Sequence, residues 1–365
     1  MNRIYNFAAG PSQLPLDVLE EAKRDLLNYK GSGMSVMEMS HRSSSYKKIQ
    51  EEVGERIKHL MGLGDDYDIL FLQAGGSLQF YMVPLNFLKG DEVGSYLVTG
   101  SWAKKAYDEG TRFFNTQKLA SSEDKNFSYI PEINLDNLDP RTKFLYLCTN
   151  NTIYGTRIRP DLIPKNLKSL LVADMSSNIL SEVYDFNKFD LIFAGVQKNL
   201  GPAGVVIVLI RKGTLEDRND LPTMLDYRTH ISKDSIYNTP PCFNIYMCGL
   251  VAKYLEDNGG ILEFQKKNEE KAKLLYDYID NSKIFTNPVN KEDRSLMNVT
   301  FVTGSKDLDE KFVEGAKDRG LENLKGHRSV GGMRASIYNS MTIDGVKALI
   351  NYMEDFEKEY KNGNL

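Results

Sequence analysis

Phe189-Asp190-Leu191-Ile192-Phe193-Ala194-Gly195-Val196-Gln197-Lys198 is a run that is apolar along most of its length and ends in a polar pair. The next six residues contain two glycines and a proline, and they lead into a second apolar run at 205–209. Near-continuous apolar runs of this length are typical of strands whose two sheet faces are both covered by helices. We therefore predict that Lys198 lies between two buried strands of one sheet.

The same texture extends through most of the chain. Further apolar runs occur at 69–72, 95–98, 144–147 and 170–173, and stretches with apolar side chains at helical spacing lie at 17–27 and 49–57. This alternation predicts an α/β fold with a mostly parallel sheet flanked by helices. After about residue 260 the pattern changes to a charged helix, two short strand-like runs and a closing helix, which is typical of a smaller α+β domain. We expect an N-terminal segment at 1–15, a large domain at 16–260 and a small C-terminal domain at 261–365.

Composition limits the partners. The 365 residues carry a net charge of −4, so the overall field does not attract nucleic acid, and an anionic ligand needs a local basic cluster. The four histidines show no metal-ligand spacing, and we expect no metal. Three cysteines cannot all pair, and no stretch is apolar for the roughly 18 residues that a membrane span needs. With no visible signal peptide, we expect a cytoplasmic protein.

Lys198 and Asp174 are the first candidates for chemistry. Asp174 ends the apolar run at 169–174, and 24 residues separate it from Lys198, which suits one crossover between parallel neighbours. The carboxyl ends of such strands line the ligand crevice of an open α/β sheet. Desolvation lowers the pKa of an amine and makes it a nucleophile toward a carbonyl. The alternatives are a lysine whose head group reaches the surface and an aspartate that caps a helix.

Two further motifs follow predicted strands. Gln73-Ala74-Gly75-Gly76-Ser77 precedes a helical run, and glycines at a helix N-terminus let backbone N–H groups bind a phosphate. Gly-Gly-Ser is also common in plain turns. Trp102, the only tryptophan, follows the strand at 95–98. Its ring is suited either to stacking on a planar cofactor or to packing in a core or interface.

Together these motifs resemble the phosphoserine aminotransferase family, class V members of the fold-type I enzymes that use pyridoxal phosphate (PLP). The resemblance covers nearly the whole chain. Matching motifs lie, in the family's order, at residues 6–11, 39–43, 72–77, 99–102, 150–156, 173–177, 195–204, 238–241 and 326–336.

The resemblance implies a role for each matching position. Lys198 would carry PLP covalently and later move the substrate proton, and Asp174 would pair with the protonated ring nitrogen. Thr152 would touch the phenolic oxygen of PLP, and Trp102 would stack on its ring. The PLP phosphate would be held by Gly76, Ser77 and Gln197, joined by Asn238 and Thr239 from the other subunit of a homodimer with shared active sites.

The resemblance also implies the substrates. Glutamate and 3-phosphohydroxypyruvate would be converted to 2-oxoglutarate and O-phospho-L-serine in serine biosynthesis. It leaves open a second reaction, from 3-hydroxy-2-oxo-4-phosphooxybutanoate to 4-phosphohydroxy-L-threonine in pyridoxine biosynthesis. These substrates carry two acidic groups, which planar guanidinium forks suit. We expect Arg334 to bind the α-carboxylate, and the distal acid to be bound by His41, Arg42, His327 and Arg328.

Three alternatives are weaker. Each His-Arg pair taken alone is typical of a solvated surface. A serine–glyoxylate transaminase or a cysteine desulfurase would share the fold, but the paired His-Arg motifs favour a doubly anionic substrate. A nucleotide-binding module would need a phosphate loop or a dinucleotide fingerprint. Residues 326–331 have the Gly-x4-Gly spacing, but Gly332-Met333 follows where that loop needs lysine and serine or threonine.

Overall fold

A seven-stranded sheet forms the centre of the computed structural model, which describes residues 3–363; the ends of the first and last expected domains, at 1–2 and 364–365, lie outside the described residues. The strand order is β2-β10-β9-β8-β5-β3-β4. β10 is antiparallel to both of its neighbours, and the other pairs are parallel. The strands are β2 (Tyr67–Leu72), β3 (Val93–Val98), β4 (Asn115–Ser121), β5 (Thr142–Cys148), β8 (Leu170–Asp174), β9 (Leu191–Gly195) and β10 (Val206–Arg211).

Every strand of this sheet except β4 coincides with an apolar run in the sequence, which confirms the mostly parallel α/β fold. β4 is different because it is the edge strand and pairs with β3 alone. Its side chains are half-buried or exposed, and its sequence is correspondingly polar. An edge strand with one covered side needs no continuous apolar run, so the pattern that marks the central strands is missing here.

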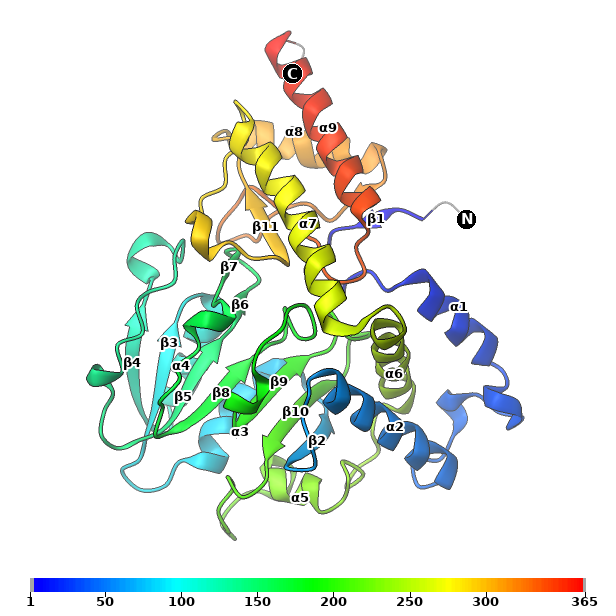
Figure 1. The fold of residues 1–365 in the computed structure, drawn as a ribbon, viewed down its shortest axis with the longest axis vertical. Helices are drawn as coiled ribbons and strands as arrows, with labels where there is room; N and C mark the ends of the chain where they lie inside the picture. Colours follow the sequence, from blue (N-terminus) through cyan, green and yellow to red (C-terminus); the bar gives the residue numbers. More distant parts are fainter. Residues whose placement is uncertain (1–2, 364–365) are drawn as a thin grey trace.

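Helices cover both faces of the sheet (Figure 1). On one face, the core includes α1 (Leu16–Asp25), α2 (Ser44–Leu60) and α6 (Cys242–Asp257). On the other, it includes α3 (Gly75–Phe87), α4 (Ser101–Thr111) and α5 (Tyr227–Ile231). Successive residues of a strand point to opposite faces. Phe71 accordingly packs with the first group, and its neighbours Leu70 and Leu72 pack with the second.

The C-terminal part forms a separate apolar core above the sheet in Figure 1. Its elements are α7 (Gly260–Asn281), β11 (Asn298–Phe301), α8 (Lys306–Asp318), β12 (Leu321–Glu322), β13 (Met333–Ser336) and α9 (Ile343–Lys361). The N-terminal segment joins this core: β1 (Tyr5–Asn6) pairs with β12, and the Phe7 side chain is buried among the C-terminal aromatic residues. Within residues 3–363, the helices are too short or too polar to cross a membrane.

Candidate active site

Asp174 and Lys198 lie at the same edge of the sheet, as their spacing predicts. Asp174 is the last residue of β8, and Lys198 comes three residues after the end of β9. The two strands are parallel neighbours, with Asp174 opposite Phe193. The crossover between them contains tight turns and a short 3-10 helix, Phe186–Lys188, in place of an α-helix. This compact connection keeps the two strand ends close together.

The Lys198 amine is held in place and partly desolvated. Its Nζ donates a hydrogen bond to Thr152 Oγ1 at 2.9 Å. Burial lowers the pKa of Lys198, and the negative charge of Asp174 opposes this shift without cancelling it. A lowered pKa increases the fraction of neutral amine at neutral pH, and the neutral amine is the nucleophile toward a carbonyl.

Asp174 is buried and held by its own turn. The backbone N–H of Ser176 donates to Asp174 Oδ1 at 2.9 Å. Burial raises the pKa of this carboxyl group, and the positive charge of Lys198 acts against that shift. Within the described residues no ion pair joins Asp174 to Lys198 directly. The site therefore offers an amine and a carboxylate to two ends of one bound group.

Thr152 connects the lysine to the C-terminal core. It lies in the turn between the short strands β6 (Asn150–Asn151) and β7 (Thr156–Arg157). While its hydroxyl accepts from Lys198, its carbonyl accepts from Arg334 Nη1 at 3.3 Å. Arg334 belongs to β13, and its Nε is buried without a partner among the described residues. One threonine thus places a guanidinium group beside the lysine.

The glycine motif forms the start of α3. Ala74 and Gly75 both adopt left-handed backbone conformations, with φ of 66° and 70°. Gly76 and Ser77 then occupy the first helical turn, where backbone N–H groups lack helical partners and bind anions. A Cβ added at Gly76 would lie 3.6 Å from both the Phe193 ring and Ser176 Oγ, so this turn packs directly on β9 and beside Asp174.

Trp102 lies in the first turn of α4. The centre of its ring is 5.9 Å from Lys198 Nζ. Its Nε1 is buried and makes no hydrogen bond within residues 3–363. An amine, a carboxylate, an aromatic ring and a helix N-terminus therefore surround one space. This donor set fits PLP, which presents an aldehyde, a protonatable ring nitrogen, a flat ring and a phosphate.

The comparisons with known proteins agree with this donor set. A family model described as aminotransferase class V matches residues 4–349. Phosphoserine aminotransferase of Bacillus cereus is 51% identical over 360 residues, which covers 98% of this chain and 99% of the relative. The corresponding protein of Listeria monocytogenes is 50% identical over 367 residues, covering 100% and 99%. The chain belongs to the phosphoserine aminotransferase family.

Solved structures place the fold in the same family. Phosphoserine aminotransferase from Bacillus circulans subsp. alkalophilus matches with a TM-score of 0.95 at 43% identity, covering 98% of this chain and 99% of that one. The PLP-bound phosphoserine aminotransferase from Trichomonas vaginalis matches with a TM-score of 0.90 at 37% identity, covering 96% and 100%. Membership of this family confirms the fold-type I architecture, the aminotransferase activity on small molecules and PLP as the cofactor.

Some of the residues expected in a phosphoserine aminotransferase site lie apart from Lys198 in the single chain. His41 and Arg42 lie between the 3-10 helix Val36–Glu38 and α2, and Arg42 is exposed. Thr239 is exposed as well, and its carbonyl accepts from Gln73 Nε2 at 2.9 Å. Within the described residues, no hydrogen bond or ion pair joins His41, Arg42, Asn238 or Thr239 to Lys198 or Asp174.

Gln197, His327 and Arg328 lie nearer. Gln197 directly precedes Lys198, and its carbonyl accepts from the backbone N–H of Ser12. His327 and Arg328 lie in the loop between β12 and β13, where His327 Nδ1 is 2.7 Å from Ser329 Oγ. Burial lowers the pKa of His327, and the positive charges of Arg334 and Arg328 lower it further. His327 therefore shares one basic region with both arginines.

Sequence reasoning assigned no role to the N-terminal segment, which packs on the lysine. Gly10 adopts φ of 138°, and a Cβ added there would lie 3.3 Å from Lys198 Cγ. Ser12 Oγ donates to the carbonyl of Lys198 itself. The only signal in the sequence was the pair Gly10-Pro11, in a segment with neither helical nor strand periodicity.

A buried polar network, which sequence reasoning also missed, joins the site to the C-terminal core. Asn150 Nδ2 donates to Asn298 Oδ1 at 2.8 Å, and Asn298 Nδ2 donates to Tyr338 OH at 3.2 Å. Tyr338 OH in turn donates to the carbonyl of Ala9 at 2.8 Å. Asn150 precedes Thr152, and Ala9 precedes Gly10. The network therefore fixes both segments that contact Lys198.

Proposed function

We propose that this protein transfers the amino group of L-glutamate to 3-phosphohydroxypyruvate, giving 2-oxoglutarate and O-phospho-L-serine. The observation that carries the proposal is the Lys198 amine, desolvated, bonded to Thr152 and adjacent to Asp174. Arg334 on the same threonine supplies a cation for a substrate carboxylate. The high identity to phosphoserine aminotransferases supports the choice of substrates.

The residues of the site have distinct tasks in this reaction. PLP, when bound, supplies an aldehyde that accepts the amino group and a ring that withdraws electrons from the substrate Cα. Lys198 holds the cofactor and, once released by the incoming amine, acts as the base that removes the Cα proton and as the acid that returns it. Asp174 keeps the ring nitrogen protonated. Arg334 binds the α-carboxylate through its planar guanidinium group.

The residues that lie apart from Lys198 lead us to propose a homodimer with shared sites. Apolar side chains are exposed beside them: Leu27 at 83%, Met37 at 57% and Tyr237 at 46%. Met37 lies near His41 and Arg42 in the sequence, and Tyr237 directly precedes Asn238. A second copy of the chain would cover these apolar groups and bring the polar ones into a site. Three free cysteines are consistent with a cytoplasmic location.

The visible absorbance spectrum of the purified protein tests the reaction. We expect a band from the covalent link between PLP and Lys198, which disappears with L-glutamate and returns when 3-phosphohydroxypyruvate is added. Lys198→Ala is expected to remove the band and the turnover. Lys212→Ala is a matched control, because Lys212 is exposed just after β10. A band that disappears without returning would exclude the phosphorylated keto acid and retain an aminotransferase.

A further inference from the structure

Lys105 belongs to the same basic region as the substrate arginines but has no assigned task. It lies in α4, one turn after Trp102, and its Nζ is 4.3 Å from the centre of the Trp102 ring. The distances from this ring to Lys105 and Lys198, 4.3 and 5.9 Å, place the two amines at most about 10 Å apart. Lys105 also lies close enough to His327 to lower the pKa of that imidazole.

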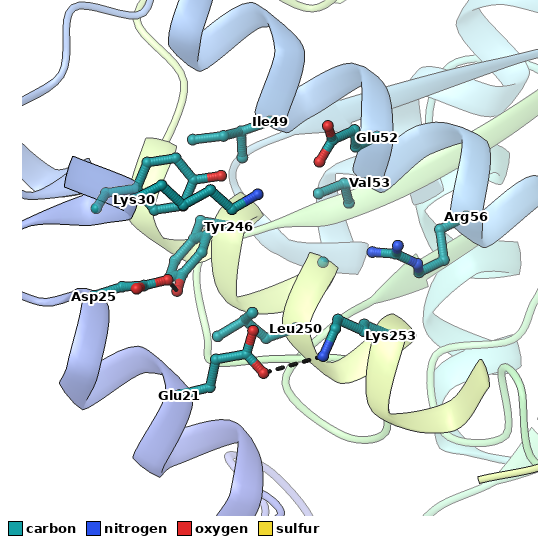
Figure 2. Close-up of a pocket in the computed structure, with 12 residues that line it drawn as sticks. Glu21, Asp25, Lys30, Ile49, Glu52, Val53, Arg56, Tyr246, Leu250 and Lys253 are labelled. Atoms are coloured by element: carbon teal, nitrogen blue, oxygen red, sulfur yellow. Dashed lines mark hydrogen bonds and ion pairs between the residues drawn. The ribbon is translucent and has the colours of Figure 1, made fainter. Parts of the chain in front are cut away.

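These cations have no acidic partners of their own. Within residues 3–363, none of the ion pairs includes Lys105, His327, Arg328 or Arg334, although most basic clusters elsewhere are balanced. Figure 2 shows such a balanced region, a pocket of about 190 Å³ between α1, α2 and α6. There Lys253 pairs with Glu21 at 3.3 Å. An unbalanced cluster of cations beside a catalytic lysine requires an anion, because like charges that lie together are otherwise destabilising.

Two donors in the same region also lack partners. Trp102 Nε1 and Arg334 Nε are buried and make no hydrogen bond within the described residues. A buried donor without an acceptor costs about 1–3 kcal/mol, which an oxyanion would recover. Val330, from the loop that carries His327 and Arg328, packs against the same core cluster as Trp102. The loop and α4 thus face one another across this region.

We propose that Lys105 is a specificity-determining residue whose ammonium group binds the phosphate of the phosphorylated substrate beside His327 and Arg328. This inference rests on the proposed function, because it assigns the distal acidic group of that substrate. The phosphorus lies only a few bonds from the carbon that reacts at Lys198, and the separation of the two amines matches this span. A phosphate carries more charge than the distal carboxylate of glutamate, so Lys105 favours the phosphorylated acid.

Steady-state kinetics of Lys105→Met test the proposal. A charge-assisted hydrogen bond contributes enough to raise the KM for 3-phosphohydroxypyruvate by about 10- to 30-fold, with little change in kcat. The KM for glutamate should change by less than about threefold, because its distal group carries a single charge. Lys105→Arg should restore most of the lost affinity. Inorganic phosphate, used as a competitive inhibitor, should bind Lys105→Met more weakly than the unchanged protein.

Lys104→Met is the matched control, because Lys104 is the neighbouring lysine and pairs with Asp108 and Glu123. Its KM values should not change. An unchanged KM in Lys105→Met would overturn this proposal and leave the proposed function intact. A shifted visible band in Lys105→Met would also overturn it, since this would mean that the loss acts through Trp102. If the unchanged protein does not use 3-phosphohydroxypyruvate, the proposed function fails, and phosphate inhibition alone then decides the role of Lys105.

Discussion

At the scale of single residues, two opposing effects set the chemistry of Lys198. Desolvation lowers its pKa, and the carboxylate of Asp174 raises it, with desolvation the larger effect. The amine is therefore neutral over a wider pH range than that of an exposed lysine. The same carboxylate is needed for the cofactor ring, so Asp174 serves both the amine and the ring.

Replacing Asp174 separates these two effects. Asp174→Asn removes the attraction that favours the charged amine, so the pKa of Lys198 in the cofactor-free protein should fall further. The pH dependence of the reaction between Lys198 and a small carbonyl reagent measures this pKa. Asp185→Asn is the control, because Asp185 is exposed and pairs with Lys188. A pKa that rises or stays the same in Asp174→Asn would contradict the electrostatic account.

Thr152 allows a second test at this scale, because its hydroxyl and its carbonyl bind different groups. Thr152→Val removes only the hydrogen bond to Lys198, and we expect kcat to fall about tenfold. The carbonyl that binds Arg334 remains, so the KM for glutamate should change little. Thr152→Ser keeps the hydroxyl and serves as the control. An equal rise in the glutamate KM would show that the side chain acts on the arginine as well.

Residues at strand ends were predictable from the sequence, and residues that act over long range were not. Lys198 and Asp174 each end an apolar run, and a parallel sheet brings such ends together. Gly10 and Asn298 carry no local pattern of this kind. Gly10 contacts a residue 188 positions later, and Asn298 bonds to one 148 positions earlier. Contacts over such separations follow from tertiary packing, which local periodicity does not encode.

At the scale of elements, the Asn298 network joins β11, β13, the β6–β7 turn and the N-terminal segment. Asn298 is fully buried, and its amide also donates to Ser336 Oγ at 3.0 Å. Asn298→Ala would leave polar groups of Asn150 and Tyr338 buried without partners. At about 1–3 kcal/mol for each such group, we expect a loss of about 3 kcal/mol in the free energy of unfolding.

Chemical denaturation of single and double variants measures this coupling. If Asn150 and Asn298 act through one network, the cost of Asn150→Ala and Asn298→Ala together should be less than the sum of the single costs. Asn115→Ala on the edge strand β4 is the control, and its effect should stay within about 0.5 kcal/mol. Additive costs would mean that the two amides stabilise the fold independently. A raised KM for glutamate would show in addition that the network positions Arg334.

The elements themselves differ in how far sequence predicts them. Central strands have both faces covered and show as apolar runs, whereas the polar edge strand β4 does not. The separation of 24 residues between Asp174 and Lys198 correctly predicted neighbouring strands. It did not reveal that the connection lacks an α-helix. Turns and 3-10 segments have no extended periodicity, so the residue spacing alone does not distinguish them from a helix.

At the scale of the whole molecule, a single chain carries all of the lysine site but leaves His41 and Arg42 away from it. Arg42 is exposed, near apolar side chains that are exposed as well. Two readings are possible in physical terms: the pair serves the site of a second copy, or it belongs to the solvated surface. Only the first makes the two subunits depend on one another for activity.

Mixing two inactive variants separates these readings. Lys198→Ala loses the reactive amine, and Arg42→Ala loses the cation that we expect the partner to receive. In a mixed dimer with shared sites, one site contains both defects and the other contains neither. Equal amounts of the two, unfolded and refolded together, should therefore recover about a quarter of the activity of the unchanged protein. Sedimentation should show dimers throughout, and no recovery beyond that of Arg42→Ala alone would mean that each chain uses its own Arg42 or none.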